Sequence, residues 1–260
     1  MNAIVVNGAG GRMGRLVGTS LRRAGFRDVA GCDPAVEPPL RLADGELPLV
    51  DDAVEALEPH GVLVDFSHPD ASDTLVRAAQ ARSARLVVGT TGHSEVQRAA
   101  LRQAAEKVPV VLSQNFSLGI NRLVQVLPAL GVLVQQGFDV ELMEAHHRGK
   151  RDAPSGTTAL LLEALLGNDP SNRRVHGRFG TETRREAGEV GVHSLRAGQI
   201  PGEHTLLLAG ASEVVEIRHR ALDRSAFVSG VAPAVHFVRN HGPGLYSMLD
   251  VMADAPQSVV

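Results

Sequence analysis

The sequence is poor in cysteine, tryptophan, tyrosine and lysine. Its 260 residues include one Cys, one Tyr and no Trp. The single Cys32 excludes an internal disulfide and suits a reducing compartment; at the end of an apolar segment it is expected to be a small buried residue rather than a reactive thiol. No apolar run approaches the ~18 residues that span a bilayer, and an apolar strand begins at residue 3, which leaves no room for a signal peptide. We therefore expect a cytoplasmic protein without a membrane partner.

The sequence has no large excess of positive or negative charge. The formal net charge is −3, and Arg, Asp and Glu are scattered without a basic stripe. Few aromatic rings are available to stack on bases, so nucleic acid is not an expected partner. The hydrophobic content of 43% is enough for a packed core, and the length allows one large domain or two small ones.

Almost every basic residue is an arginine. Lys107 and Lys150 are the two lysines of the chain. A guanidinium stays charged at any physiological pH, whereas a partly buried ammonium can be tuned to release a proton. Lys150 lies within residues 144–157, which also hold adjacent histidines, acidic residues and a helix start. This segment predicts proton chemistry beside an anion site.

A glycine-rich turn follows the first apolar strand. Gly8, Gly10, Gly11 and Gly14 permit a tight turn and open a helix at 12–24, whose N-terminal amides can hold a pyrophosphate. Alone this signal is weak, since many α/β turns need glycine for conformation only. A second strand ends at Asp33, about 20 residues downstream, where dinucleotide folds place a ribose-binding acid.

Short apolar runs alternate with helical patterns up to residue 113, which predicts a parallel sheet wrapped by helices. The expected strands are 4–6, 29–32, 61–66, 86–88 and 108–112, and the expected helices are 12–24, 71–82 and 94–107. Ligands bind outside the carboxyl ends of such strands, so the loops at 65–69, 89–92 and 114–117 should face a cofactor. Each of these loops, taken alone, also has the composition of an ordinary connection between a strand and a helix.

The pattern changes beyond residue 117. We expect helices at 118–136, 155–166 and 227–239, and strands at 139–145, 190–196, 204–209 and 213–221. Residues 168–189 are polar and Arg-rich, which fits a mobile loop or lid. The predicted fold is α/β, with a Rossmann-type dinucleotide-binding domain over 1–117 and 228–260 and a smaller α+β domain with a mixed sheet over 118–227.

Several motifs in this order also occur together in a known family. They are Gly8 to Gly14, Asp65-Phe66-Ser67, Gly89-Thr90-Thr91-Gly92, Asn115 to Gly119, Glu144 to Thr157, Arg196-Ala197-Gly198 and Pro201 to Thr205. The chain resembles the dihydrodipicolinate reductase family over most of its length. The signature from His146-His147 to Ser155-Gly156-Thr157 is specific, and the glycine loop is not.

The resemblance implies an NAD(P)H-dependent oxidoreductase that reduces 4-hydroxy-tetrahydrodipicolinate, a small cyclic imine dicarboxylate, to tetrahydrodipicolinate in lysine and diaminopimelate biosynthesis. It implies a homotetramer built through the second-domain sheets, so that 118–227 would serve substrate binding and oligomerisation. His146 would be the catalytic acid/base and Lys150 the proton donor. Substrate would bind to His147, Ser155, Gly156 and Thr157. Cofactor would bind to Gly8, Ala9, Gly10, Gly11, Arg12, Met13, Asp33, Gly89, Thr90, Thr91, Gln114, Asn115, Phe116 and Ser117.

The residues themselves support this chemistry. Hydride arriving at one ring carbon leaves electron density that a proton must quench, and Lys150 is the natural acid. The amides at the helix start after Ser155 can take a carboxylate. A single histidine is more often a surface or core group. The His pair could instead bind a metal, but cysteine ligands are absent and no further ligand has helical spacing, so no metal is expected.

NADH is the expected cofactor in preference to NADPH. Asp33 can accept both ribose hydroxyls, whereas a 2′-phosphate would meet its carboxylate, and the next residue is Pro34 rather than Arg. Two alternatives stay open: a related NAD(P)-dependent oxidoreductase acting on another small dicarboxylate or imine, and a non-catalytic NAD-sensing protein. Fold analogy alone does not choose among them.

Overall fold

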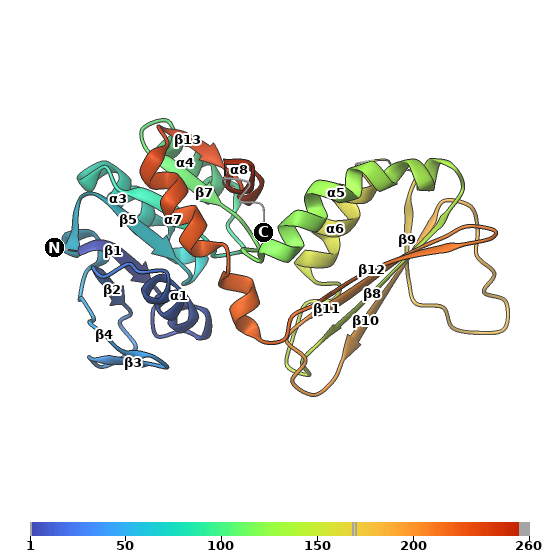
Figure 1. Ribbon diagram of the computed structural model, residues 1–260, viewed down its shortest axis with the longest axis horizontal. Helices are drawn as coiled ribbons and strands as arrows, with labels where there is room; N and C mark the ends of the chain where they lie inside the picture. The colour runs from blue at the N-terminus through green and yellow to red at the C-terminus, as the bar shows by residue number, and fades with distance from the viewer. Residues whose placement is uncertain (1, 168, 170, 255–260) are drawn as a thin grey trace. The chain divides into compact units, whose positions relative to one another are not determined.

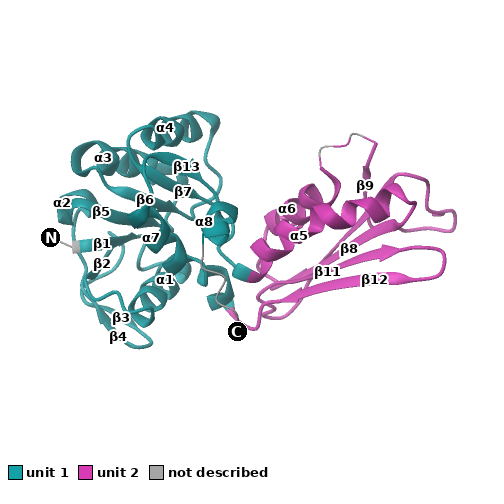
Figure 2. Cartoon of the chain, turned by 45° about the horizontal axis from the view of Figure 1, so that its top comes forward, with its two compact units in different colours: residues 1–118, 224–260 teal, residues 119–223 magenta. Residues whose placement is uncertain are grey.

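The chain divides into two units, one inserted into the other. The computed structural model describes residues 2–167, 169 and 171–254; unit 1 comprises residues 1–118 and 224–260, and unit 2 residues 119–223 (Figure 2). The chain passes from one unit to the other twice, after residue 118 and after residue 223. Two hydrogen bonds within unit 1 connect the segments near these points. The amide of Gly230 donates to the carbonyl of Phe116 at 2.8 Å, and the amide of Leu118 donates to Ser229 Oγ at 3.2 Å.

Short apolar segments form the parallel sheet of unit 1, with five strands that were predicted and a sixth, β13, that was not. The strands are β1 (Asn2–Asn7), β2 (Val29–Cys32), β5 (Leu57–Asp65), β6 (Arg85–Val88), β7 (Pro109–Leu112) and β13 (Gly244–Tyr246). They pair in parallel in the order β13-β7-β6-β5-β1-β2. Side chains on both faces are buried, which explains why these strands read as continuous apolar runs.

Helices cover both faces of this sheet (Figure 1). They are α1 (Arg12–Arg23), α2 (Ala53–Ala56), α3 (Ser72–Arg82), α4 (Glu95–Ala105), α7 (Val231–Asn240) and α8 (Met248–Asp254), with 3-10 turns at Pro69–Ala71 and Arg224–Val228. One apolar core joins α1, α7 and α8 to the sheet, and the other joins α2, α3 and α4. Because β1 lies between β2 and β5, the strand order reverses there, and a ligand crevice opens at such a point.

Unit 2 is a mixed sheet with two helices on one face (Figure 1). The elements are α5 (Leu118–Gln135), β8 (Asp139–His146), α6 (Gly156–Leu166), β9 (Arg173–His176), β10 (Glu189–Arg196), β11 (Glu203–Ala209) and β12 (Val214–Arg220). Strands β8, β10 and β9 are parallel, and β11 and β12 add in antiparallel fashion beside β8. Alternate residues such as Val140, Leu142, Leu206 and Leu208 are buried, as a one-sided sheet requires.

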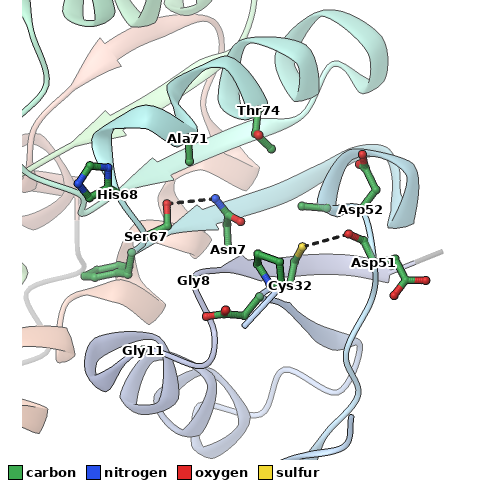
Figure 3. A pocket seen from close by; sticks show the side chains of 14 residues that line it. Asn7, Gly8, Gly11, Cys32, Asp51, Asp52, Ser67, His68, Ala71 and Thr74 are labelled. Carbon is green, nitrogen blue, oxygen red and sulfur yellow. Dashed lines mark hydrogen bonds between the residues drawn. The ribbon is translucent and has the colours of Figure 1, made fainter. Parts of the chain in front are cut away.

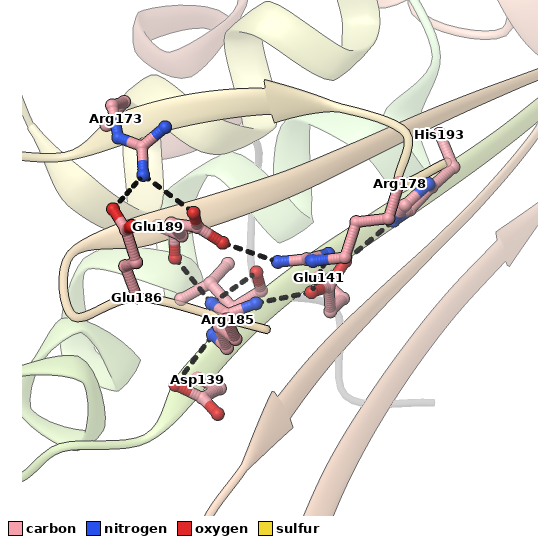
Figure 4. Close-up of polar contacts among 9 residues, drawn as sticks. Asp139, Glu141, Arg173, Arg178, Arg185, Glu186, Glu189 and His193 are labelled. Atoms are coloured by element: carbon pink, nitrogen blue, oxygen red, sulfur yellow. Dashed lines mark hydrogen bonds and ion pairs between the residues drawn. The ribbon is translucent and has the colours of Figure 1, made fainter. Parts of the chain in front are cut away.

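The Arg-rich segment 168–189 differs from the expected loop. It contains strand β9, and three of its arginines bind acids of the sheet (Figure 4). Arg173 Nη2 contacts Glu189 Oε1 at 2.6 Å; Arg178 contacts Glu189 Oε2 at 2.7 Å and Glu141 Oε1 at 3.0 Å. Arg185 Nε lies 2.8 Å from Asp139 Oδ1. These arginines are ion-pair partners rather than free charges; residues 168 and 170 lie outside the described part of the chain.

Helix α5 corrects another expectation. Its 18 residues have a mean hydropathy of 1.4, so by length and composition alone it could cross a membrane. Polar residues such as Asn121 and Arg122 interrupt the apolar residues of this segment, so the sequence shows no continuous apolar run there. One such helix is weak evidence, because a helix of a soluble protein meets the same criteria. Here a Cβ added to Gly131 would lie 2.8 Å from the carbonyl oxygen of Leu165, so α5 packs against α6 within unit 2.

Several short elements were not predicted. They are β3 (Leu40–Leu42) and β4 (Gly45–Leu47), which form a hairpin, together with α2, β13 and α8. Each has seven residues or fewer, and the short strands among them lack the continuous apolar run that marks the short strands that were predicted.

The glycine turn supplies a stability test. A Cβ on Gly14 would lie 2.0 Å from the carbonyl oxygen of Gly8, a backbone atom that cannot move aside. We expect Gly14→Ala to destabilise the protein by about 1–3 kcal/mol, as overpacking does. The matched control is Gly18→Ala in the same helix, where the new methyl would meet only side-chain ends at 3.2 Å. Thermal unfolding followed by circular dichroism should show a lower Tm for Gly14→Ala alone; equal Tm values would contradict the clash.

Candidate active site

The glycine turn and Asp33 meet at the carboxyl edge of the unit 1 sheet. Gly8 has φ +76°, and a Cβ there would lie 2.7 Å from the Phe66 carbonyl oxygen, so only glycine fits. The amide of Gly10 donates to Asp33 Oδ2 at 2.9 Å. A pocket opens beside them (Figure 3), lined by Asn7, Gly8, Gly11, Cys32, Asp33, Pro34, Asp51, Asp52, Ala53, Phe66, Ser67, His68, Ala71 and Thr74. Burial raises the pKa of the Cys32 thiol, which agrees with a structural role.

A buried carboxylate joins three of the strand ends around this pocket. Asp65 is 1% exposed and accepts hydrogen bonds from Asn7 Nδ2 at 2.7 Å, Ser67 Oγ at 2.6 Å and Thr90 Oγ1 at 2.5 Å. Its donors come from the ends of β1 and β5 and from the loop after β6. Because Asp65 binds all three, it holds the loops of the predicted cofactor site in one arrangement.

The other predicted cofactor residues are divided between surface and interior. Arg12, Thr91 and Gln114 are exposed, and Gly8, Gly10, Met13 and Gly89 are partly buried. Ala9, Thr90, Asn115, Phe116 and Ser117 are buried. Thr90 uses its hydroxyl on Asp65, and Phe116 packs in the core beside Phe66, with ring centroids 5.5 Å apart. The buried side chains pack beneath the loops and stabilise them. A ligand bound at the surface would therefore contact the backbone of these residues rather than their side chains.

In unit 2, strand register brings four polar side chains together beneath the helices. Glu144 and His146 lie two apart on β8 and so share a face. His204 of β11 is the register partner of Glu144, and Arg196 of β10 is the partner of His146. We call these residues the Glu144 cluster.

Contacts within the Glu144 cluster are short. His146 Nδ1 lies 2.7 Å from Glu144 Oε2, and Arg196 Nη2 donates to Glu144 Oε1 at 2.7 Å. The rings of His146 and His204 meet edge to face with centroids 5.3 Å apart. Glu144, His146 and His204 are 1%, 6% and 3% exposed. The cluster is therefore a buried, charged group of the kind that functional sites contain.

Burial and charge act in opposite directions on Glu144. Burial alone would raise the pKa of its carboxyl, but contacts with His146, Ser194 and Arg196 outweigh burial and hold the pKa well below its usual range. Burial lowers the pKa of His204 to about 3, and the nearby charge of His146 acts in the same direction. Glu144 is thus an anion and His204 a neutral imidazole near pH 7.

The loop after β8 places Lys150 next to this cluster. The amide of Ala197 donates to the His146 carbonyl at 2.9 Å, and that of Arg148 to the Gly198 carbonyl at 3.2 Å, so the loops after β8 and β10 are joined. Lys150 Nζ contacts Asp152 Oδ1 at 2.9 Å and Oδ2 at 2.8 Å. The same Arg196 nitrogen that binds Glu144 also donates to the carbonyl of Asp152 at 2.6 Å. One arginine thereby connects the Glu144 cluster with the Lys150 loop.

Helix α6 begins beside the same loop. Ser155 caps it: the amide of Thr158 donates to Ser155 Oγ at 3.2 Å, and this hydroxyl also contacts His204 Nε2 at 3.1 Å. The Ser155 side chain is 2% exposed and fully engaged, whereas Gly156 is exposed and Thr157 partly exposed. The first turn of α6 therefore presents backbone at Gly156 and Thr157, while Ser155 ties the helix to β11.

Glu144, Arg196 and His204 belong to the Glu144 cluster but were not predicted as site residues. The sequence feature that could have revealed them is a polar residue at a position that faces the core. Glu144 alternates along β8 with the buried Val140 and Leu142, so it lies on their face. His204 lies in the same way on the face of the buried leucines of β11. A polar residue on the buried face of a strand needs a partner. Naming that partner requires the strand order, which the sequence alone does not provide.

The cluster also bears on the expectation that no metal is bound. One ligand atom from each of Glu144, His146 and His204 lies within 4.8 Å of the others, so these three residues could hold a metal ion. Spacing along the chain does not reveal this set, because pairing of β8 with β11 brings the three residues together. However, Glu144 already binds Arg196, and a guanidinium at 2.7 Å opposes a second cation on the same carboxylate.

Two family models match the chain almost end to end. The model described as "Dihydrodipicolinate reductase, N-terminus" matches residues 2–116, and "Dihydrodipicolinate reductase, C-terminus" matches residues 119–252. A 4-hydroxy-tetrahydrodipicolinate reductase of Rubrobacter xylanophilus is 44% identical and covers 98% of this chain and 100% of its own. One of Anaeromyxobacter dehalogenans is 38% identical, covering 97% and 98%.

A solved structure has the same fold. Dipicolinate-bound dihydrodipicolinate reductase from Paenisporosarcina sp. TG-14 superimposes with a TM-score of 0.72 at 23% identity, covering 95% of this chain and 97% of the other. The α/β fold, with a Rossmann-like sheet and a second mixed sheet, agrees with the prediction from sequence.

The lowered pKa of His204 generates a pH test. The unfolded chain takes up a proton on this residue below about pH 6.5, while the folded protein does so only near pH 3, so stability falls as the pH drops through this range. At pH 5 the loss is up to about 2 kcal/mol. Urea unfolding at pH 7.5 and pH 5 should show a smaller pH effect for His204→Gln than for wild type. The exposed His176→Gln is the control, and equal pH effects in all three proteins would contradict the prediction.

Proposed function

The chain belongs to the dihydrodipicolinate reductase family, and from that premise we propose which residues carry out each part of the reaction. The protein is an NAD(P)H-dependent oxidoreductase that reduces 4-hydroxy-tetrahydrodipicolinate in lysine and diaminopimelate biosynthesis. The product lacks the hydroxyl of the substrate, so the ring gains a hydride and loses hydroxide, which leaves as water when protonated. The observation that carries our assignment of roles is Lys150 next to the buried Glu144 cluster and the start of α6.

Unit 1 fits a dinucleotide. The turn at Gly8 and Gly10 leaves space that a Cβ would fill, within 3 Å of Phe66 and Asp33 atoms, and α1 begins directly after it. Its N-terminal amides and the glycine backbone would hold the pyrophosphate, and Asp33 the ribose. The remaining contacts would come from the loops at 89–91 and 114–117. Bound NAD(P)H supplies the hydride.

NADH is the proposed preference. Asp33 Oδ2 accepts from Gly10, and Oδ1 accepts from the amide of Ala35, so the carboxylate is held at the mouth of the turn. A ribose 2′-hydroxyl can donate to this carboxylate, whereas a 2′-phosphate would be repelled by it. Arg12 is exposed at the same turn and would reduce that repulsion without removing it.

Unit 2 supplies the groups for the substrate. The amides of Gly156 and Thr157 at the start of α6 would bind one carboxylate, and His147 would contact the ring. The Lys150 ammonium would attract the dianion and donate the proton that lets hydroxide leave. His146, at the end of β8, would act as acid/base. Asp152 holds Lys150 on both carboxylate oxygens and so keeps the ammonium beside the site.

Assembly through the open face of the unit 2 sheet is proposed as well. The face opposite α5 and α6 carries Met143, Leu195 and Val214, which are 39%, 51% and 60% exposed. The same face carries charged residues such as Glu141 and Arg218, and apolar side chains surrounded by charged ones are compatible with a subunit interface. We propose a homotetramer in the cytoplasm, where a reduced thiol and NADH are both available.

Cofactor preference can be measured directly. In an assay that couples dihydrodipicolinate synthase to this protein, kcat/KM should be higher with NADH than with NADPH. Asp33→Ala should raise the KM for NADH and narrow the preference while leaving kcat near wild type, because Asp33 does not touch the reacting ring. A higher kcat/KM with NADPH in the wild-type enzyme would overturn the proposal.

Lys150→Arg separates charge from proton donation. Arginine keeps the positive charge and lacks a usable proton, so kcat should fall by ~10²-fold or more, the usual size of general acid catalysis. NADH affinity, measured by fluorescence titration, should stay near wild type. Lys107→Arg, remote in sequence on unit 1, is the matched control. If Lys150→Arg retains kcat and only raises the KM for the dicarboxylate, Lys150 binds substrate without donating the proton.

A further inference from the structure

We propose that Glu144 is a positioning residue that fixes the proton of His146 on Nδ1 and leaves Nε2 to exchange a proton with the substrate. The inference rests on the proposed role of His146 as acid/base. It adds a second requirement to that role: an imidazole with one defined tautomer.

The first argument is the contact between the two side chains. His146 Nδ1 and Glu144 Oε2 are 2.7 Å apart in a buried setting. Two lone pairs at this separation would repel, so a proton lies between the atoms, and Glu144, with its low pKa, leaves that proton on the imidazole. Among the described residues, neither atom meets hydrogen-bond geometry with any partner, so the contact between them is a close ion pair rather than an aligned hydrogen bond. A carboxylate in this position also stabilises the imidazolium that forms when Nε2 takes up a proton.

Arg196 determines which carboxylate oxygen faces the histidine. A guanidinium donates only, and Arg196 Nη2 binds Glu144 Oε1 at 2.7 Å. The same nitrogen binds the carbonyl of Asp152, so it is held on two sides. Oε2 therefore remains directed at His146, and the carboxylate has no free rotation between its partners.

His204 restricts the ring from another side. It meets His146 edge to face and is anchored by Ser155 at 3.1 Å, and its neutral state adds no second positive charge. Rotation of the His146 ring would break the contact with Glu144 without offering an alternative carboxylate in the cluster. The imidazole is thus held in one orientation and one tautomer.

The arrangement makes a specific prediction for Glu144→Gln. Arg196 requires an acceptor, so the carboxamide oxygen would turn to it and the amide NH₂ would face His146. Nδ1 must then accept a hydrogen bond, which moves the proton to Nε2. The substitution keeps the shape of the side chain, yet it inverts the tautomer and removes the charge that stabilises the imidazolium.

Kinetics and nitrogen NMR test this together. In wild-type protein with ¹⁵N-labelled histidine, with the His146→Gln spectrum identifying the signal, His146 should show a protonated Nδ1 and an unprotonated Nε2 above the pH of its titration. In Glu144→Gln the two signals should exchange character. The variant should lose about 10²-fold or more in kcat, the effect of a wrong tautomer, with the KM for NADH near wild type.

Glu141→Gln is the matched control. Glu141 lies three residues earlier on β8, on the opposite face, and also pairs with a histidine, since its Oε2 is 2.7 Å from His193 Nε2. It should retain kcat and the His146 spectrum, so a general effect of removing charge from this strand is separated from the tautomer effect.

The outcomes distinguish the inference from its premise. Unchanged kcat in His146→Gln would remove the acid/base role of His146 itself. Loss of kcat in His146→Gln with retained kcat in Glu144→Gln would overturn only the positioning role. A wild-type spectrum with the proton on Nε2 would overturn it without any variant, and so decides the matter even if Glu144→Gln fails to fold. Loss of wild-type activity on treatment with EDTA, with recovery on adding Zn²⁺, would mean that the cluster binds a metal instead.

Discussion

Parallel strand pairing is the constraint on which both sites depend. Parallel strands end at the same edge of a sheet, so the residues that finish neighbouring strands converge even when they are far apart in sequence. In unit 1 this edge gathers the side chains around Asp65 from the ends of β1, β5 and β6. In unit 2 it brings the end of β8 beside the end of β10, where His146 faces Arg196. The proposed cofactor residues and the proposed proton-transfer residues are thus placed by the same geometric rule in two different sheets.

Each of these edges is organised around one buried carboxylate. Asp65 accepts hydrogen bonds from neutral donors, whereas Glu144 is hydrogen-bonded by a guanidinium and lies in ion-pair contact with an imidazole. A buried charge is costly without partners, so a carboxylate at such a point requires its neighbours to remain in place. The two sets of partners suit two different roles, because neutral donors hold loops in shape, whereas an ionised network can stabilise a charge that develops on His146 during a reaction.

Much of this organisation is visible in the sequence. The period of the apolar residues locates the long strands and helices, and the segment from His146 to Thr157 predicts a proton-transfer site because its residue types are unusual together. The limits are physical. Hairpin β3–β4 and helix α2 are stabilised by tertiary packing and leave no periodic signal. The Glu144 cluster depends on the strand order β11-β8-β10, so His204 becomes the partner of Glu144 only when the chain returns some 60 residues later. Within 171–189, arginine–carboxylate pairs attach the chain to the sheet, and such pairs leave no apolar period in the sequence.

The insertion of unit 2 within unit 1 has a consequence for biosynthesis. The ribosome releases residues 1–118 first, but one face of their sheet is covered by α7 and α8, and its edge strand is β13. Those elements emerge only after the whole of unit 2 has been made. Until then, one apolar face and one edge of the sheet remain uncovered in the strands already made, which are β1, β5, β6 and β7. Residues 119–223 are complete by that time and can fold. Vectorial synthesis thus favours unit 2 folding before unit 1, and leaves apolar surface of the nascent N-terminal segment exposed in the meantime.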